Sequence, residues 1–312
     1  MEYTVLSIII LIFCVLLISF VCYLKVFYLK RPKPLKENEY NIPKEPYFQK
    51  FKEQLTTWIK TARSLDYEKV ETISFDGLKL SGKYYEKIKG APIEIMFHGY
   101  KGSAERDLSG GIERCFALDR NALIVDQRGA GNSQGRTTTF GIKESLDCLK
   151  WIDFAISRFG KDVKIILTGI SMGGTTVLTT TQYDLPKNVK YVLSDCAFSS
   201  AEEIIKKVIA DMNLPVKLAF PFVKLGGIIF GKFNLSKTSP ICAIQNCKVP
   251  VIFFHGNKDS LIPYEMSVKV FEKCKTTKKL ILIDGAEHGL AYPVDKQKYL
   301  SSIREFENEI NL

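Results

Sequence analysis

Two serines lie between glycines in the pattern G-x-S-x-G, at residues 131–135 and 169–173. This pattern supplies a nucleophile when it forms a sharp turn between a strand and a helix, because the strained turn pushes the serine hydroxyl clear of the sheet. Ser171 has that context, since the β-branched run at residues 163–168 precedes it and a helical stretch follows. Ser133 instead follows a loop and leads into threonine-rich sequence. We therefore predict Ser171 as the nucleophile.

A serine hydroxyl is a poor nucleophile unless a base takes its proton, and this chain offers 3 histidines, His98, His255 and His288. After a nucleophile on such a turn, the acid and then the base follow along the chain. His288 comes just after the last expected strand, meets that order and is the predicted base. We assign a structural role to His255, which ends a strand, while His98 lies upstream of Ser171 on another strand.

The base needs a carboxylate that fixes its tautomer and stabilises the imidazolium. Asp259 follows the expected strand at residues 251–254 and lies between Ser171 and His288 in the chain. An isolated aspartate in such a loop commonly caps a turn, so its place relative to the other two residues is what favours catalysis. Asp195, after the preceding strand, stays open as the alternative acid, because some sites of this kind shift the acid by one strand.

An acyl carbonyl under attack also needs backbone N–H donors aimed at its developing oxyanion. One donor is expected from Met172, directly after the nucleophile. The second is expected from Tyr100, in the loop that follows the strand at residues 93–97. Gly99 allows the turn there, and His98 is expected to fix the loop.

The elements that must hold these residues alternate between short β-branched runs and longer helical patterns. Apolar residues recur at steps of three and four over residues 142–159 and 299–310, as helices with one buried face require. Asp76-Gly77 predicts a hairpin between the first two strands. The expected strands are residues 70–75, 78–85, 93–97, 122–125, 163–167, 189–193, 251–254 and 280–283. This order predicts an α/β fold, a mostly parallel eight-stranded sheet with helices on both faces.

Five motifs in this order resemble the motif set of the α/β-hydrolase superfamily. They are residues 97–99, 126–133, 169–174, 255–259 and 287–288. The resemblance covers about residues 68–312 and is closest to small membrane-anchored bacterial hydrolases, which also resemble prolyl-oligopeptidase catalytic domains. It implies the α/β-hydrolase fold and a Ser-Asp-His mechanism without metal or cofactor. It also implies that residues 126–133 form a structural turn near the site.

The N-terminal segment has the character of a membrane anchor. No charged residue occurs over residues 3–24, whose helical length of about 33 Å spans a hydrocarbon core. A cleaved signal peptide would instead carry positive charge before a shorter apolar run and a small-x-small cleavage site after it. The basic residues follow the run, at Lys25, Lys30, Arg31, Lys33 and Lys36. The positive-inside rule then predicts one membrane-spanning helix with the catalytic domain in the cytoplasm.

Composition and charge agree with that location. The net charge of +10 comes from scattered lysines rather than from an arginine-rich stripe, which argues against nucleic acid as a partner and favours anionic lipid near the anchor. The 8 cysteines show no metal-ligand spacing and are expected as free thiols. We divide the chain into an anchor with its basic flank (1–31), a linker with an amphipathic helix (32–66) and one hydrolase domain (67–312). A helical cap insertion over the sheet is expected at about 200–247, either as packed helix or as a lid.

These residues predict a membrane-anchored serine hydrolase that cleaves an ester, thioester or related acyl bond through an acyl-enzyme on Ser171. The expected partner is a small acyl substrate, which the anchor and the apolar insertion favour as hydrophobic, and no cofactor or metal is expected. Two alternatives stay open. One is a serine peptidase of prolyl-oligopeptidase type, and the other is a non-catalytic binding protein on a hydrolase fold.

Overall fold

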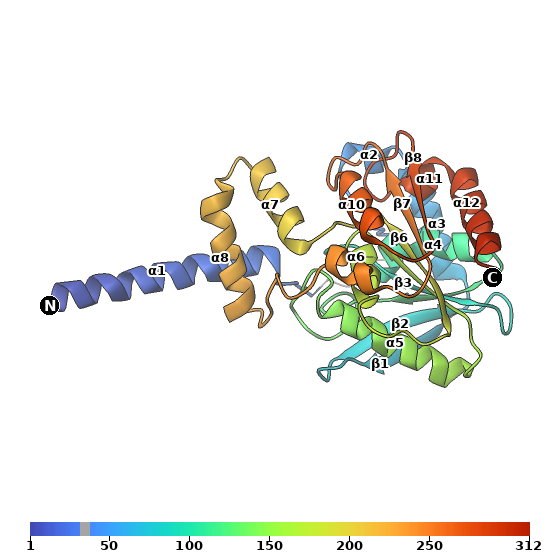
Figure 1. Ribbon diagram of the computed structural model, residues 1–312, viewed down its shortest axis with the longest axis horizontal. Coiled ribbons are helices and arrows are strands. Elements are labelled where there is room, and N and C mark those ends of the chain that lie inside the picture. Colours follow the sequence, from blue (N-terminus) through green and yellow to red (C-terminus); the bar gives the residue numbers. More distant parts are fainter. Residues whose placement is uncertain (32–37) are drawn as a thin grey trace.

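The computed structural model describes residues 1–31 and 38–312 and contains the expected eight-stranded sheet (Figure 1). The strands are β1 (Glu68–Ile73), β2 (Lys79–Tyr85), β3 (Ile93–Phe97), β4 (Asn121–Val125), β5 (Ile165–Ile170), β6 (Val189–Asp195), β7 (Val251–Gly256) and β8 (Lys278–Ile283). Their order across the sheet is β1-β2-β4-β3-β5-β6-β7-β8. Among these eight strands, β2 has the opposite direction to the others, because it pairs antiparallel with both β1 and β4.

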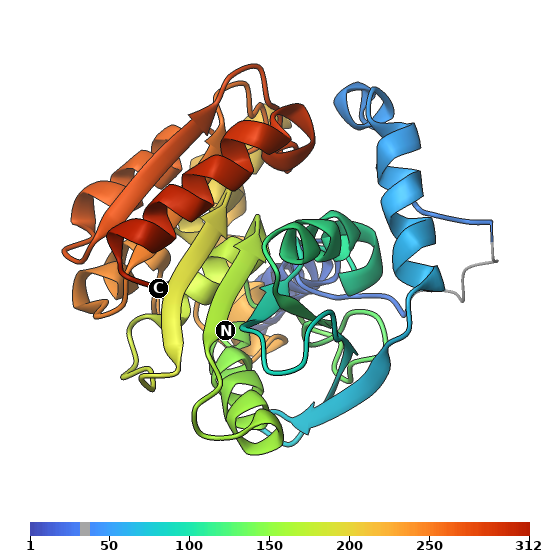
Figure 2. The same cartoon turned by 90° about the vertical axis from the view of Figure 1, so that its right-hand side faces the viewer.

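Two layers of helices cover the sheet (Figure 2). Their side chains join the strands in apolar clusters, with Trp151 and Val177 on one face and Trp58, Ile112 and Phe306 on the other. One layer contains α5 (Glu144–Phe159), α6 (Met172–Thr180), α9 (Pro240–Ala243), η1 (Ile244–Asn246) and α10 (Glu265–Lys273). The other contains α3 (Lys52–Ser64), α4 (Ala104–Ala117), α11 (Ala291–Val294) and α12 (Lys296–Glu309). Strands covered on both faces are buried along their whole length, as β3, β4 and β7 are.

A buried charge cluster fixes β3 against the helices of one face. Glu94 on β3 is fully buried and forms ion pairs with Arg114 and with Arg120, the latter at 2.7 Å. Arg120 also donates to the hydroxyl of Tyr191 on β6 and to Glu307 on α12, at 2.6 Å each. Burial alone raises the pKa of Glu94, but the two guanidinium groups outweigh it and lower the pKa to about 2. Removing one partner of such a buried pair is strongly destabilising, because it leaves an uncompensated charge.

The N-terminal helix α1 (Glu2–Val26) projects from this body and crosses α8 (Val216–Ile229), which follows α7 (Ala201–Asp211) (Figure 1). An 18-residue stretch of it has a mean hydropathy of 3.3, and the helix is long and apolar enough to cross a membrane. Its last residues join the body through Phe27, which is fully buried, and through Leu29, whose N–H donates to the carbonyl of Arg136 at 2.8 Å. The residues directly after α1 therefore pack into the domain.

The predicted fold class is confirmed, and the strand and helix expectations differ from the structure only at their ends. The predicted amphipathic helix corresponds to α3, preceded by the short α2 (Pro46–Gln49). The domain division itself stays a prediction. Pro32, Pro34 and the basic residues Lys33 and Lys36 lie outside the described residues.

Candidate active site

Ser171 occupies the tight turn between β5 and α6 in a backbone conformation that side-chain-bearing residues rarely adopt, with φ 56° and ψ −120°. The neighbouring glycines are required by close backbone approach. A Cβ at position 169 would lie 2.0 Å from the carbonyl oxygen of Gly173, and one at position 173 would lie 1.9 Å from that of Phe97. The Ser171 N–H donates to the carbonyl of Asp195 at 2.8 Å, which ties the turn to the end of β6.

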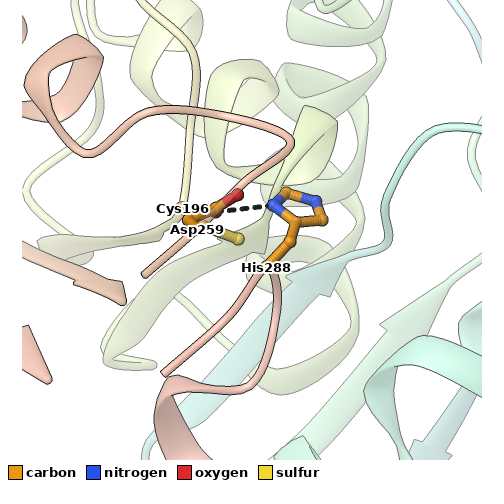
Figure 3. Close-up of side chains that lie close together, drawn as sticks. All are labelled: Cys196, Asp259 and His288. Atoms are coloured by element: carbon orange, nitrogen blue, oxygen red, sulfur yellow. Dashed lines mark hydrogen bonds and ion pairs between the residues drawn. The ribbon is translucent and has the colours of Figure 1, made fainter. Parts of the chain in front are cut away.

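The structure brings Ser171, Asp259 and His288 together in one hydrogen-bonded series. The Oγ of Ser171 lies 3.0 Å from Nε2 of His288, and Nδ1 of His288 lies 2.7 Å from Oδ2 of Asp259. Because the carboxylate accepts the Nδ1 proton, Nε2 is left to accept from the serine hydroxyl. Figure 3 shows the Asp259–His288 bond between the loops that follow β7 and β8.

Asp259 is held as an ionised acceptor. Its second oxygen, Oδ1, accepts from the N–H groups of Leu261 and Ile262, at 3.0 and 2.7 Å. Burial on its own raises the pKa of Asp259, but hydrogen bonds from His255 and His288 outweigh it and lower the pKa to about 2. A carboxylate that stays ionised in this way can orient the imidazole of His288 and stabilise its protonated form.

His255, predicted to have a structural role, contacts the same carboxylate. Its Nε2 lies 3.1 Å from Oδ2 of Asp259 and 2.8 Å from the carbonyl of Ile262, and both of these partners are acceptors. Nε2 therefore carries the proton, and Nδ1 faces the hydroxyl of Ser267 at 2.7 Å. Asp259 thus receives two imidazole donors. The i, i+4 spacing of His255 and Asp259 across a strand end is the sequence signal for this contact.

Asp195 lies at the end of β6, yet its carboxylate has a different partner. Its Oδ2 accepts from the hydroxyl of Tyr299 at 3.0 Å, and its Oδ1 has no hydrogen-bond partner within the described chain. Burial raises the pKa of Asp195 to about 6, against a lowering by the Tyr299 hydroxyl. This geometry favours Asp259 over Asp195 as the acid.

The hydroxyl of Ser133, in the other G-x-S-x-G pattern, is engaged in hydrogen bonds with the backbone. Its Oγ donates to the carbonyl of Asp126 at 2.6 Å and accepts from the N–H of Ser81 at 2.9 Å. The Asp126 carboxylate in turn accepts from the N–H groups of Ala104 and Asn132, at 3.0 Å each. These contacts close residues 126–133 into a turn, as the resemblance implies.

The loop that follows β3 holds Tyr100 beside the nucleophile turn. His98 fixes this loop, because its Nδ1 donates to the carbonyl of Gly99 at 2.8 Å while its Nε2 accepts from the N–H of Gln127 at 3.0 Å. Within the described part of the chain, no acceptor pairs with the backbone N–H of Tyr100 or of Met172. Both groups are thus available for a ligand oxygen, as an oxyanion hole requires.

The side chains of this loop also contact the end of α1. The hydroxyl of Tyr100 donates to the carbonyl of Val26 at 2.6 Å, and Nζ of Lys101 donates to the carbonyl of Lys25 at 2.9 Å. These carbonyls belong to the last turn of α1, whose C=O groups have no partner within the helix. The candidate oxyanion loop and the apolar helix are therefore joined directly, which the sequence did not indicate.

Cys196 lies beside Asp259 and His288, and the three could in principle hold a metal ion (Figure 3). The chemistry of the donors argues against that use. Burial raises the pKa of the Cys196 thiol well above its usual range, and the carboxylates of Asp195 and Asp259 add to the effect. The protonated thiol is a poor ligand, and the His288 nitrogen on this side already donates to Asp259.

A cavity of about 310 Å³ opens onto Ser171 and His288. Its apolar wall comes partly from the segment assigned to the linker, through Ile42, Tyr47 and Phe48, the last of which lies 3.9 Å from the Cβ that Gly289 lacks. The cap insertion does not contribute to the lining that the structure describes. Its helices α7 and α8 join the cluster around Met172 and the end of α1 instead. In the sequence, the apolar residues within 42–48 were the feature that could have indicated this wall.

Replacing Asp259 and Asp195 separately tests which carboxylate serves His288. Asp259→Asn should lower kcat on an activated acyl ester by about 10⁴-fold, because the amide favours the wrong imidazole tautomer. Asp195→Asn should retain turnover near the wild-type level. Steady-state kinetics on both variants, with thermal unfolding as the control for folding, checks this. A loss confined to Asp195→Asn would move the acid to β6.

Removing the Tyr100 hydroxyl tests the link between α1 and the loop. Tyr100→Phe should lower kcat about fivefold with little change in KM, because loss of one hydrogen bond of about 1 kcal/mol loosens the donor loop. Tyr67→Phe, remote at the start of β1, is the matched control. An unchanged kcat in Tyr100→Phe would mean that His98 and Gln127 hold the loop without help from α1.

Comparison with known proteins shows which fold this chain shares. A family model described as alpha/beta hydrolase fold matches residues 95–219. The protein YqkD of Bacillus subtilis is 27% identical over 195 residues, which cover 62% of this chain and 64% of YqkD, less than two thirds of that protein. The thiohydrolase aneE of Aspergillus aculeatus is 29% identical over 152 residues, 47% of each chain.

Among solved structures, the esterase Pf2001 of Pyrococcus furiosus superposes with a TM-score of 0.66 at 22% identity. The superposition covers 91% of this chain and 98% of the esterase. At that identity the likeness demonstrates a common fold. Together with the family match and the sheet order, it places this chain among the proteins of the α/β-hydrolase fold, and the relatives support a hydrolase.

Proposed function

We propose that this protein is a membrane-anchored serine hydrolase that cleaves an ester, thioester or related acyl bond through an acyl-enzyme on Ser171. The observation that carries the proposal is the continuous series Ser171–His288–Asp259, with distances of 3.0 and 2.7 Å, at the wall of a cavity. Two unpaired backbone N–H groups beside the serine supply the remaining part, a site for an oxyanion.

In the proposed reaction His288 takes the proton of Ser171 as Oγ bonds to the acyl carbon. The carbonyl oxygen gains negative charge and accepts from the N–H groups of Tyr100 and Met172. The tetrahedral species collapses, and the leaving alcohol or thiol takes the proton from Nε2 of His288. Water then attacks the acyl-enzyme, gives its proton to His288, and the free acid leaves while Ser171 recovers the proton. No redox step or metal is needed for this sequence.

The cavities support a hydrophobic acyl substrate. Ile42, Phe48 and Leu261 supply apolar lining beside Ser171. A second cavity of about 420 Å³ lies at the end of α1 and shares Lys101 and Arg106 with the first. An acyl chain could thus approach from the anchor side. The thiohydrolase among the relatives is the reason to include thioesters in the proposal.

We place the protein in the cell membrane, with α1 crossing once and the catalytic domain in the cytoplasm. Lys25, Lys30 and Arg31 follow the apolar run in the described chain, and no basic residue precedes it. The cysteines of the catalytic domain are free thiols, as in a reducing compartment.

A fluorophosphonate probe tests the nucleophile. The probe should label the wild-type protein and Ser133→Ala, because it reacts with an activated serine and leaves inert hydroxyls unmodified. Ser171→Ala and His288→Ala should lose labelling while keeping the wild-type unfolding temperature. In-gel fluorescence measures the result. Absence of labelling on a folded wild-type protein would overturn the proposal and favour a binding role for the fold.

Thiol labelling in intact cells tests the topology. Cys242 is exposed on the catalytic domain, so a membrane-impermeant maleimide should modify it only after the cells are opened. Cys242→Ser gives the background from the other thiols. Modification of Cys242 in unopened cells would place the domain outside and contradict the cytoplasmic assignment.

A further inference from the structure

The helix α8 carries an apolar stripe that no other part of the described chain covers. Leu218 is 64% exposed, as much as Phe13 in the middle of α1, and Ile228 and Ile229 are 46% and 40% exposed. Half-buried Phe222 and Leu225 continue the stripe at helical spacing, and Met212 and Leu214 extend it at the start of the helix. An exposed apolar surface of this kind marks an interaction site.

The face of α8 beside this stripe packs closely on α1. A Cβ at Gly226 would lie 2.4 Å from the carbonyl oxygen of Ser19, so the two backbones approach as only small residues allow. Ser19 is fully buried by this contact, and the ring of Phe230 lies 5.0 Å from that of Phe20. Figure 1 shows α8 crossing α1 steeply instead of running alongside it.

The length of α1 ahead of this contact determines the depth in a bilayer at which α8 crosses α1. Residues 2–18, ahead of the contact, measure about 26 Å at 1.5 Å per residue. The hydrocarbon core of a bilayer is about 30 Å thick. A helix that crosses the core therefore reaches the far interface only at the residues that α8 covers. If α1 stands along the membrane normal, a helix that crosses it steeply at this level lies in the plane of the interface.

We propose that α8 is an interfacial helix, with the stripe Leu218–Phe222–Leu225–Ile228–Ile229 facing the acyl chains of the bilayer that α1 crosses. The charge of the helix fits this occupant, because α8 contains Lys217 and no acidic residue, while its other lysine, Lys224, pairs with Glu202 of α7 at 3.0 Å. The inference rests on the membrane anchoring proposed above. It assigns the cap insertion a lipid-binding role that the sequence left open between packed helix and lid.

The consequence for the catalytic site follows from the packing of the cap. The cluster that contains Phe220 and Val223 of α8 also contains Met172, next to the nucleophile, and half-buried Tyr100 packs against it. The residues that carry the candidate oxyanion donors therefore belong to, or pack against, the same apolar cluster as the interfacial helix.

Fluorescence quenching in vesicles tests the depth of α8. Full-length protein with Cys14, Cys22 and Cys242 changed to serine would carry an environment-sensitive fluorophore on Leu218→Cys, and on Ile228→Cys as a second position. The protein is reconstituted into phosphatidylcholine vesicles with or without bromine on the acyl chains. We expect a loss of fluorescence at both positions, comparable to that at Phe13→Cys in α1. Lys161→Cys, exposed ahead of β5, should lose none.

The outcomes separate this inference from the anchoring on which it rests. Quenching at Phe13→Cys without quenching at positions 218 and 228 would overturn the interfacial helix and leave the anchor standing, as when a second copy of the chain covers the stripe. Absence of quenching at Phe13→Cys would overturn the anchoring and the inference together. The unfolding temperature of each labelled variant, compared with wild type, controls for misfolding.

Discussion

The close approach of three backbone segments at the carboxyl edge of the sheet is the constraint on which the site depends. Gly173 lies against the carbonyl of Phe97, and Gly169 lies against Gly173, with no room for a Cβ at either position. This packing forces Ser171 into its strained conformation and brings the end of β3 beside the start of α6. The loop that carries the Tyr100 N–H and the turn that carries the Met172 N–H are adjacent for that reason. A larger residue at position 173 would separate the nucleophile from the loop that carries Tyr100.

The second organising feature is the attachment of α1 to the catalytic end of the domain. Tyr100 and Lys101 donate to the last carbonyls of α1, and Phe27 packs between Phe140 and Phe233 at ring distances of 5.8 and 5.0 Å. An anchor that only set the location of the protein would need no such contacts. Here the end of the helix is part of the packing that supports the candidate oxyanion loop.

The sheet and the three residues of the candidate triad could be predicted from the sequence, because each residue's position depends on the strand that precedes it. Each of Ser171, Asp259 and His288 directly follows a strand, and strand ends of a parallel sheet meet at one edge, so the order of the strands determines which side chains converge. The wall of the cavity could not be derived in this way. Ile42 and Phe48 belong to no strand, and their position depends on contacts with residues hundreds of positions away in the chain. The orientation of α8 could not be predicted either, because the same apolar pattern suits a helix that packs on a sheet and a helix that packs on another helix.

His255 is both a buried structural residue and a contact of the candidate catalytic carboxylate. A histidine at a strand end is commonly a satisfied core residue, and His255 is fully buried with hydrogen bonds at both ring nitrogens. Yet one of these nitrogens also faces Oδ2 of Asp259, the oxygen that His288 contacts. The carboxylate has little freedom to rotate, because it accepts from the imidazoles of His255 and His288 and from two backbone N–H groups. His255, which does not line the cavity, thus helps to set the position of His288. The structural role and the catalytic geometry are then the same interaction, because the contact that satisfies the buried histidine also fixes the acid.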